Sequence, residues 1–380
     1  MSLLKPFSDP KWKKLKKIKT IGKGWMGEVV LCRLDKQLYV VKMSKVTEAH
    51  LKMKKKGIKT PEYWRELYFC EHYGGQSLIL VRTLDYEISD VCNFKHPMNA
   101  SHNFYRFLTP RDKKYHQQLA ASPYCLMNIQ PYFPSHILRN HYEELWNFAY
   151  RRTNNRIDTM KPPTAAIRWL KKSEFQDQHL YFTQKMFYGW IIDIMRQTEK
   201  LHSMGFSHRD IHSSNILILD APINGLHAIL IDFGRVSGRV WGDFDPTGDI
   251  GHLFWLMGTG NYIHENHRLN KLYGDKKFPI DHKHYLRARK KFVKDPRFTH
   301  IIDLCAAVPE DQIFDCAFEI AEHEMGDEIK ALMHPKYEKE IIWSRIWLID
   351  RADVMYYLKH AWTDLPAVIE RFTSAMRLMN

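Results

Sequence analysis

The segment SHRDIHSSNILILD, residues 207–220, places polar side chains suited to catalysis directly before a run of apolar residues. Asp210 offers a carboxylate that can accept a proton, and Asn215 offers a carbonyl oxygen of the kind that Mg²⁺ prefers. The run of Ile and Leu that follows is short and bounded by polar residues, which is typical of a buried strand. The segment therefore predicts a loop that carries two functional groups to the start of a strand.

A second apolar run, AILI, ends at Asp232 in the sequence IDFG. A carboxylate at the end of a buried strand can bridge a metal ion to phosphate groups, and Gly234 permits a turn immediately after it. Because this Asp follows the loop and its strand in order, chance is a poor explanation for the set. Together the two segments predict a site for phosphoryl transfer, which needs bound phosphates, positioned metal ions and an oriented hydroxyl group.

The sequence GKGWMGEV, residues 22–29, contains Gly22, Gly24 and Gly27. Residues without side chains let backbone N–H groups approach phosphate oxygens. Glycines at this spacing also occur in ordinary hairpins and in dinucleotide-binding turns, but a dinucleotide turn precedes a helix. Here the strand-like sequence EVVLC follows, which favours a loop that covers phosphates.

Lys42 ends the strand-like sequence YVVK, at a distance from the glycines that lets its ammonium reach nucleotide phosphates. A cation with apolar neighbours needs a carboxylate partner. Glu66, in the helix expected over residues 60–74, is the best placed, and Glu62 and Glu71 compete with it. An exposed lysine with an unrelated surface glutamate is an equally good interpretation of these residues taken alone.

The remaining pattern predicts a strand-rich first part and a larger helical second part. We expect a helix from Thr60 as its cap to Gly74 as its stop, and another that ends at Gly205. Two polar stretches, about 86–122 and about 134–180, are expected to be insertions. Strands are expected at 16–21, 28–34, 37–43, 77–81, 124–129, 215–219 and 228–231, and helices at 187–201, 348–362 and 365–379.

From Gly22 to Asp249 the chain resembles the protein kinase superfamily, on the Gly-rich loop at 22–29, Lys42, Glu66, H-R-D at 208–210, Asn215 and D-F-G at 232–234. The resemblance implies an α+β, bilobal protein-kinase-like fold, with a small antiparallel-sheet N-lobe and a larger helical C-lobe. The expected divisions are a basic N-terminal extension at 1–15, the N-lobe at 16–130 and the C-lobe at 131–380.

The resemblance also implies ATP and Mg²⁺ as cofactors and assigns roles to individual residues. Asp210 is then the catalytic base, Asn215 and Asp232 bind Mg²⁺, and Lys42 pairs with Glu66. The three glycines cover the phosphates. Val29, Val40 and Leu217 enclose the adenine, and the hinge lies near Met127 to Gln130. Asp249 resembles the Asp that begins a helix and supports the backbone of the catalytic loop.

Two features depart from the pattern of most protein kinases. His212 stands where many have Lys, as in aminoglycoside and choline-type kinases; its ring either holds the transferred phosphate or stabilises the loop by a hydrogen bond. The segment between Gly234 and Asp249 is short and lacks an A-P-E motif, which resembles lipopolysaccharide core heptose kinases. Ser237 and Thr247 are its only hydroxyl-bearing residues, so we do not expect regulation by phosphorylation of this loop.

Three functions remain open at this point. The H-R-D motif, the complete Gly-rich loop and the D-F-G motif favour an atypical protein serine/threonine kinase. His212 and the short segment favour a kinase of a small molecule, sugar or lipid. A binding scaffold without activity is disfavoured because Lys42, Asp210, Asn215 and Asp232 are all present.

The formal net charge of +14 is concentrated in the runs at 11–19, 51–59 and 282–294. Such runs are usually solvated surface, and we expect no dedicated nucleic-acid module because no aromatic residues interleave them in a binding pattern. They also suit an acidic protein substrate, another polyanion or an anionic membrane surface. With no apolar run near the roughly 20 residues of a membrane span, no signal peptide and six scattered cysteines, the expected location is cytoplasmic, or the host cytosol for a viral or bacterial effector.

Overall fold

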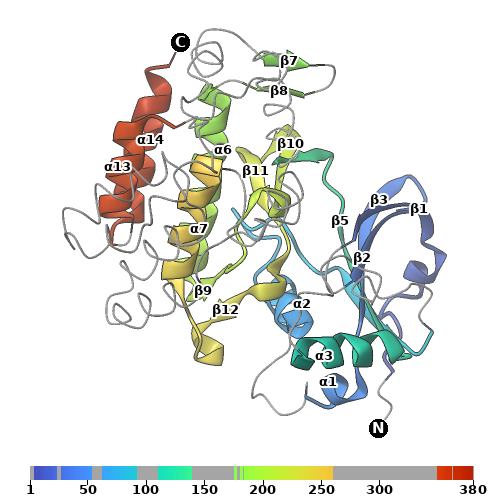
Figure 1. Cartoon of the computed structure of the whole chain (residues 1–380). Coiled ribbons are helices and arrows are strands. Elements are labelled where there is room, and N and C mark those ends of the chain that lie inside the picture. Colours follow the sequence, from blue (N-terminus) through green and yellow to red (C-terminus); the bar gives the residue numbers. More distant parts are fainter. Residues whose placement is uncertain are drawn as a thin grey trace, which may run out of the picture. The chain divides into compact units, whose positions relative to one another are not determined.

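The structure is a computed structural model that describes residues 4–23, 27–53, 62–91, 110–138, 175–177, 180–182, 184–259, 349–361 and 363–379. The chain has a mixed α+β fold, as predicted, and divides into two compact units (Figure 1). Unit 1 contains Met1–Pro134 and Asp232–Val236, and unit 2 contains Ser135–Ile231 and Ser237–Asn380. The short D-F-G segment thus belongs to unit 1, although it lies far along the chain.

Unit 1 is built on a five-stranded antiparallel sheet in the order β1-β2-β3-β5-β4. Asp35, with φ of 54°, makes the tight turn between the second and third strands. The three strands expected over the first part of the chain are confirmed, as is the strand expected at 124–129. The strands are β1 (Lys16–Lys23), β2 (Gly27–Leu34), β3 (Gln37–Lys45), β4 (Asp85–Ser89) and β5 (Cys125–Pro131).

The strand expected at 77–81 is wrong. Gln76 and Ile79 exchange two backbone hydrogen bonds, and Gly75 and Ser77 have positive φ, so the chain makes a tight turn there. The apolar run is buried as part of that turn, and β4 follows it. The expected insertion at 86–122 does not begin where predicted, because residues 86–89 belong to β4, which joins the sheet. Its later part contains the helix α3 (Pro110–Ala121), and residues 92–109 lie outside the described residues.

Helix α2 (Glu62–His72) agrees with the helix expected at 60–74 and ends shortly before Gly74. Its cap candidate Thr60 and Pro61 lie outside the described residues. Trp64 and Leu67 on this helix pack with Val46, Ile88 and Leu126 in one buried cluster. The cluster fixes α2 against the sheet. A short helix, α1 (Glu48–Met53), precedes it.

The N-terminal residues are part of the core rather than an extension. Residues 4–15, which we call the N-terminal strap, include the 3₁₀ helix η1 (Pro10–Lys14). Trp12 is 7% exposed and packs with Val30, Cys32 and Ile129 of the sheet. Lys5 exchanges two backbone hydrogen bonds with Ile88 of β4. The expected boundary at residue 15 is wrong because apolar residues alternate with the lysines and cover one face of the sheet.

Unit 2 contains a three-stranded sheet in the order β11-β10-β6. Its strands are β6 (Ser135–Ile137), β10 (Ile216–Ile223) and β11 (Leu226–Leu230), so the two predicted apolar strands are confirmed. Since β6 pairs with β10, the expected insertion at 134–180 does not begin where predicted; residues 139–174 lie outside the described residues. The other strands among the described residues of this unit are the hairpin of β7 (Phe175–Asp177) and β8 (Leu180–Phe182) and the pair of β9 (Phe206–Ser207) and β12 (Ser237–Gly238).

In unit 2, the long helix α6 (Gln184–Ser203), many of whose side chains are buried, ends before Gly205 with φ of 79°. Tyr188 of α6 donates a hydrogen bond to Asp353, which also accepts one from Arg371. These bonds join α6 to α13 (Arg351–His360) and α14 (Leu365–Arg377), the two helices expected near the C-terminus. A further helix, α7 (Pro246–Thr259), carries Asp249 in its first turn. No helix within the described ranges has the length and apolar character needed to cross a membrane.

Candidate active site

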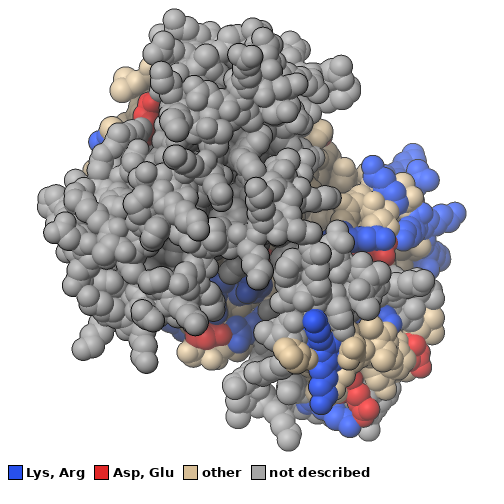
Figure 2. Space-filling model, viewed as in Figure 1, with Lys and Arg blue, Asp and Glu red and all other residues tan. Residues whose placement is uncertain are grey.

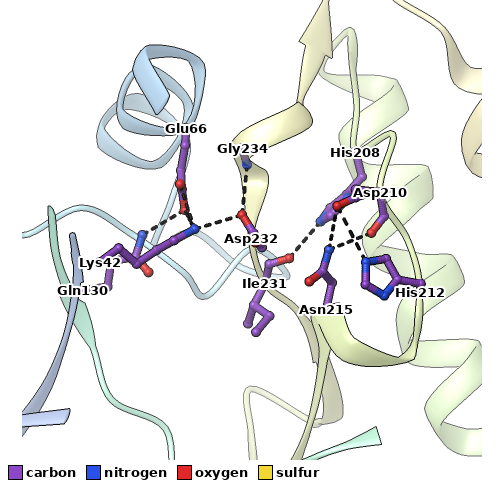
Figure 3. Close-up of polar contacts among 10 residues, drawn as sticks. All are labelled: Lys42, Glu66, Gln130, His208, Asp210, His212, Asn215, Ile231, Asp232 and Gly234. Carbon is purple, nitrogen blue, oxygen red and sulfur yellow. Dashed lines mark hydrogen bonds and ion pairs between the residues drawn. The ribbon is translucent and has the colours of Figure 1, made fainter. Parts of the chain in front are cut away.

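In unit 1, a single ammonium group contacts two carboxylates. Lys42 Nζ lies 2.6 and 2.8 Å from the two carboxylate oxygens of Glu66 and 2.9 Å from Oδ1 of Asp232 (Figure 3). Strand β3 supplies the lysine and helix α2 the glutamate. Of the three candidate partners, the structure places Glu66 beside Lys42, while Glu71 is exposed on the same helix; the side chain of Glu62 is outside the described set.

The electrostatics of this cluster follow from its burial and charge. Burial lowers the pKa of Lys42, but the negative charges of Asp232 and Glu66 outweigh this effect and the pKa is raised well above its ordinary value. Burial raises the pKa of Glu66, the charge of Asp232 adds to this, and Lys42 opposes it. Lys42 is therefore a fixed cation, and its two carboxylate neighbours leave the cluster able to accept a further positive charge.

Asp232 is held in a strained conformation. Its φ of 64° and ψ of 70° are left-handed, which is uncommon for a residue with a side chain. Oδ1 accepts a hydrogen bond from the N–H of Gly234 at 3.4 Å. Phe233 is buried and stacks on Phe69 of α2, with ring centroids 4.8 Å apart. Packing on α2 thus compensates for strain that keeps the carboxylate at Lys42.

In unit 2, the loop that opens β10 holds the second set of polar groups. Asn215 donates from Nδ2 to the backbone oxygen of Asp210 and to its Oδ2, both at 3.0 Å (Figure 3). The Asp210 carboxylate is thereby oriented by its own loop. Because the amide nitrogen of Asn215 makes both bonds, Oδ1 is the atom of this side chain that can bind a cation.

His212 lies in the same loop and makes a structural hydrogen bond. Its Nδ1 accepts from the backbone N–H of Ser214 at 3.3 Å, which caps the 3₁₀ helix η3 (Ser213–Asn215). Nε2 lies 3.6 Å from Oδ2 of Asp210. Of the two roles considered for His212, the hydrogen bond to Ser214 fits stabilisation of the loop.

Asp249 holds this loop through hydrogen bonds to its backbone. The carboxylate is fully buried and accepts hydrogen bonds from the N–H groups of His208 at 2.7 Å and Arg209 at 2.6 Å. Nε2 of His202 lies 3.0 Å from Oδ2. Since Arg209 has a φ of 61°, Asp249 holds a backbone conformation that the chain does not favour. Nε2 of His208 bonds to the backbone oxygen of Ile231, and the N–H of Ile231 donates to Asn215, so the loop is also tied to the end of β11.

Burial raises the pKa of Asp249, but the hydrogen bond and charge of His202, together with His208 and the N–H of Arg209, overcome this, and the pKa lies below its ordinary value.

A carboxyl group with a lowered pKa stabilises the fold above its unfolded pKa of about 3.9, and this contribution is lost as pH falls through the lowered pKa. We expect Asp249→Asn to reduce the free energy of unfolding by about 3 kcal/mol at pH 7, and the difference from the native protein to shrink below pH 4. Urea unfolding at several pH values measures both effects.

Asp220→Asn is the matched control, because this carboxylate is 51% exposed and its removal is expected to change stability by less than about 0.5 kcal/mol at any pH. A difference for Asp249→Asn that stays constant between pH 3 and pH 7 would contradict the assigned role of the charge.

The residues expected to contact nucleotide are described in part. Val29, Val40 and Lys42 lie on one face of the sheet, since Val29 pairs with Lys42 and alternate residues of β3 share a face. A Cβ at Gly27 would lie 1.9 Å from the backbone oxygen of Met43, so only glycine fits there. Gly22 lies near the end of β1, where an added Cβ would make only an ordinary contact with Val29, and Leu217 lies half-buried in β10 of unit 2. Gly24 is outside the described residues.

The expected hinge at Met127 to Gln130 is wrong. These residues lie within β5 and pair with β3 and β4, and the boundary between units falls after Pro134. Met127 pairs with Met43 and packs toward the strap, on the face opposite Lys42. Gln130 lies on the same face as Lys42, but its amide nitrogen donates to Glu66 at 3.3 Å. Successive side chains of a strand point to opposite faces of the sheet, which places Met127 and Gln130 on different faces. The prediction did not take this alternation into account.

Two further results concern residues near the site. Ser237 is fully buried in β12, opposite Ser207, so its hydroxyl is not accessible for modification in the folded chain. The expectation that the short segment is not regulated by phosphorylation stays a prediction, and the side chain of Thr247 is outside the described set. The contact of Gln130 with Glu66 was missed because no local signal in the sequence predicts it.

A scan of the sequence against models of known protein families finds no match, and a search of curated proteins finds no similar sequence.

Proposed function

We propose that this chain is an ATP- and Mg²⁺-dependent phosphotransferase of the protein kinase type, which transfers the γ-phosphoryl group of ATP to a serine or threonine hydroxyl of a protein. The observation that carries the proposal is the position of the Lys42 ammonium, held against Glu66 and Asp232. Lys42 is a half-buried, permanently charged lysine, and a cluster of this kind is often no more stable than apolar side chains of the same size, so stability alone does not explain it. It has a clear use as a donor to phosphate oxygens next to a metal ligand.

The proposal treats unit 1 as the smaller lobe of a bilobal kinase-like fold and unit 2 as the larger lobe. Its support is the five-stranded antiparallel sheet of unit 1, with α2 supplying Glu66, and the helices of unit 2 around α6. The order of the motifs along the chain is the order that the protein kinase resemblance requires.

In the proposed reaction, Asp210 accepts the proton of the acceptor hydroxyl as the hydroxyl oxygen forms a bond to the γ-phosphorus. The bond from this phosphorus to the oxygen bridging it to the β-phosphate breaks, and ADP leaves. Asn215 fixes the orientation of the Asp210 carboxylate, and Lys42 donates to phosphate oxygens. Gly22, Gly24 and Gly27 cover the phosphates, and Val29, Val40 and Leu217 enclose the adenine.

Asn215 and Asp232 are the proposed Mg²⁺ ligands. Their donor atoms are a carbonyl oxygen and a carboxylate, which suit a hard cation. No three His, Cys, Asp or Glu side chains gather into a metal site within the part of the chain that is described. Mg²⁺ commonly binds through one or two carboxylates together with substrate phosphates, and when bound it neutralises their developing charge.

Replacing Asp232 by Asn tests the metal assignment. We expect the Mg²⁺ concentration for half-maximal ATP binding to rise about tenfold, because a charged ligand is replaced by a neutral one. ATP binding in the presence of a chelator should stay the same. Asp220→Asn, at a similarly exposed carboxylate, should leave the Mg²⁺ titration unchanged. An unaltered titration in Asp232→Asn would remove this residue from the metal site.

A small molecule, sugar or lipid is the second candidate acceptor. It is favoured by the short segment from Arg235 to Asp245, which is occupied by β12 and the 3₁₀ helix η5 (Arg239–Trp241) and leaves little chain for a peptide-binding platform. The complete H-R-D motif at 208–210 favours a protein acceptor. We also propose a cytoplasmic location, supported by the buried free thiols of Cys32, Cys70 and Cys125.

The experiment that tests the function is transfer of labelled phosphate from Mg-ATP in a cell extract, with protein and small molecules separated afterwards. Label in protein that disappears with Asp210→Asn would support a protein kinase. Label found only in small molecules, and sensitive to the same variant, would establish the second acceptor class. No label sensitive to this variant in either fraction would contradict phosphotransferase activity.

A further inference from the structure

Unit 1 contains a cavity of about 1020 Å³ that none of the proposed catalytic residues lines. The strap, the start of β3, the end of α2 and the segment after it, β4 and the end of β5 form its walls. Tyr39 of β3 lines it and packs with the strap, on the face of the sheet opposite Lys42. The lining residues are Lys5, Ser8, Asp9, Lys11, Trp12, the segment Lys36–Tyr39, Glu71, the segment Arg82–Tyr86, Pro131, Tyr132 and Pro134.

The walls of the cavity are held in place by contacts of the strap. Trp12 is buried and meets the Tyr39 ring edge-on, with centroids 5.1 Å apart. Lys5 donates to the backbone oxygen of Tyr86 at 2.8 Å and lies 3.7 Å from the centroid of its ring. Asp85 accepts the N–H of Asp9 at 3.1 Å. The cavity is therefore a formed part of unit 1, and a ligand there would not have to order it.

The charges of the lining are only partly compensated. Four cations and three carboxylates line the cavity. Lys5 pairs with Asp85 and Lys11 with Asp9. Lys36 and Arg82 have no ion-pair partner among the residues that the structure describes, and both are exposed. An arginine that is free to offer its planar set of donors suits a carboxylate ligand.

The rest of the lining is aromatic or apolar. Tyr39, Tyr86 and Tyr132 are half-buried, and Leu38 is 37% exposed. Tyrosine and arginine are the residues on which binding energy concentrates in protein interfaces. The volume is at the upper end of the range for small-molecule sites, which is more than a single anion requires and enough for a short stretch of peptide.

We propose that this cavity binds an acidic peptide segment of a partner protein. Carboxylates of the segment pair with Lys36 and Arg82, and a neighbouring aromatic or apolar side chain packs against Leu38 and the tyrosines. The site is independent of the proposed transfer of phosphate.

The experiment uses the full chain carrying Asp210→Asn, without nucleotide, and a fluorescent random copolymer of glutamate and tyrosine as the probe. Such a copolymer presents acidic and aromatic side chains in many orders. We expect binding that weakens as salt is raised from about 0.05 to 0.3 M. The double variant Lys36→Glu/Arg82→Glu should raise the Kd at least about tenfold, and Leu38→Ser about threefold.

The control is Lys16→Glu/Lys19→Glu, which makes the same change in net charge on exposed residues of β1 that do not line the cavity. On the face drawn in Figure 2, Lys and Arg side chains gather over β1 to β3, so this control tests attraction by the basic surface as a whole. Its Kd should stay within about twofold of the parent. Thermal unfolding of each variant checks that unit 1 is intact.

Three results would overturn the proposal. Equal weakening in both double variants would show attraction by the basic surface alone, and no binding of the copolymer by the parent chain would remove the peptide ligand. Vesicles of phosphatidylcholine and phosphatidylserine provide the third: if the cavity variant loses vesicle binding but keeps copolymer binding, the surface binds membrane lipids instead. Because nucleotide and catalysis play no part, these results stand apart from the test of phosphate transfer.

Discussion

We expect replacement of Asp210 by Asn to lower kcat for the proposed phosphate transfer about 10³-fold, within the range for loss of a general base. The reason lies in the loop: Asn has the size of Asp and keeps a carbonyl oxygen for the bond from Asn215, but it cannot accept the proton of the acceptor hydroxyl. The KM for ATP should change less than about threefold, since Asp210 is not assigned to nucleotide binding. Steady-state kinetics with Mg-ATP measure both constants.

Controls for this result separate chemistry from folding. The melting temperature of Asp210→Asn should stay within about 2 °C of the native value, because the side chain is 17% exposed and one hydrogen-bond acceptor is kept. Activity within about tenfold of the native protein would contradict the role of Asp210 as base. A kcat loss accompanied by an equal loss of folded protein would leave no catalytic effect to explain and would equally contradict it.

Replacing Lys42 by Met has the second large effect, on stability as well as on activity. The substitution removes the cation that faces Glu66 and Asp232 and leaves Glu66, which is 6% exposed, with an uncompensated charge. We expect the free energy of unfolding to fall by about 3 kcal/mol at pH 7, as for other buried pairs that lose one partner. The proposed phosphate transfer should fall at least about 10²-fold, because the proposed donor to the phosphate oxygens is gone.

The double variant Lys42→Met/Glu66→Gln distinguishes the two effects. A neutral Gln at position 66 removes the buried charge and can still accept from Gln130, so most of the lost stability should return. Activity should not return, because the ammonium is still absent. Urea unfolding and initial rates test the pair. Recovery of activity together with stability would show that Lys42 acts only through the fold.

The elements of the fold were predictable where their pattern is local. The alternation of β3 and the 3.6-residue spacing of α6 identified these two elements, because burial of one face imposes those periods. Start and stop residues identified α2. The apolar run at 77–81 shows where this reasoning fails. Its residues are buried as a strand would be, but Gly75 and Ser77 adopt positive φ and turn the chain instead, and apolar content alone does not distinguish the two.

Some residues of the candidate site were also predictable from local sequence, and others were not. Lys42, Asp210, Asn215 and Asp232 were selected from motifs in which residue type and spacing express the chemistry directly. Met127 and Gln130 were misplaced because the hinge was located by sequence alone. Residues 1–15 were predicted to be a basic extension because of their lysines. The structure shows that Trp12 in this segment is 7% exposed and packs on the sheet.

The sequence by itself determined the mixed α+β character, the main strands and helices, and the order of the residues proposed for phosphate transfer. These properties depend on residues a few positions apart in the sequence, so the spacing and the chemical type of those residues are enough to predict them. Asp249 was expected to support the backbone of the H-R-D loop, and Glu66 was the favoured partner of Lys42, but only the tertiary structure decided between Glu66 and Glu71. It alone also decided that Gln130 bonds to Glu66 and that the strap and β3 line a cavity. Each of these contacts joins residues far apart in sequence, and packing of whole elements, which no short pattern encodes, selects among the partners that local chemistry permits.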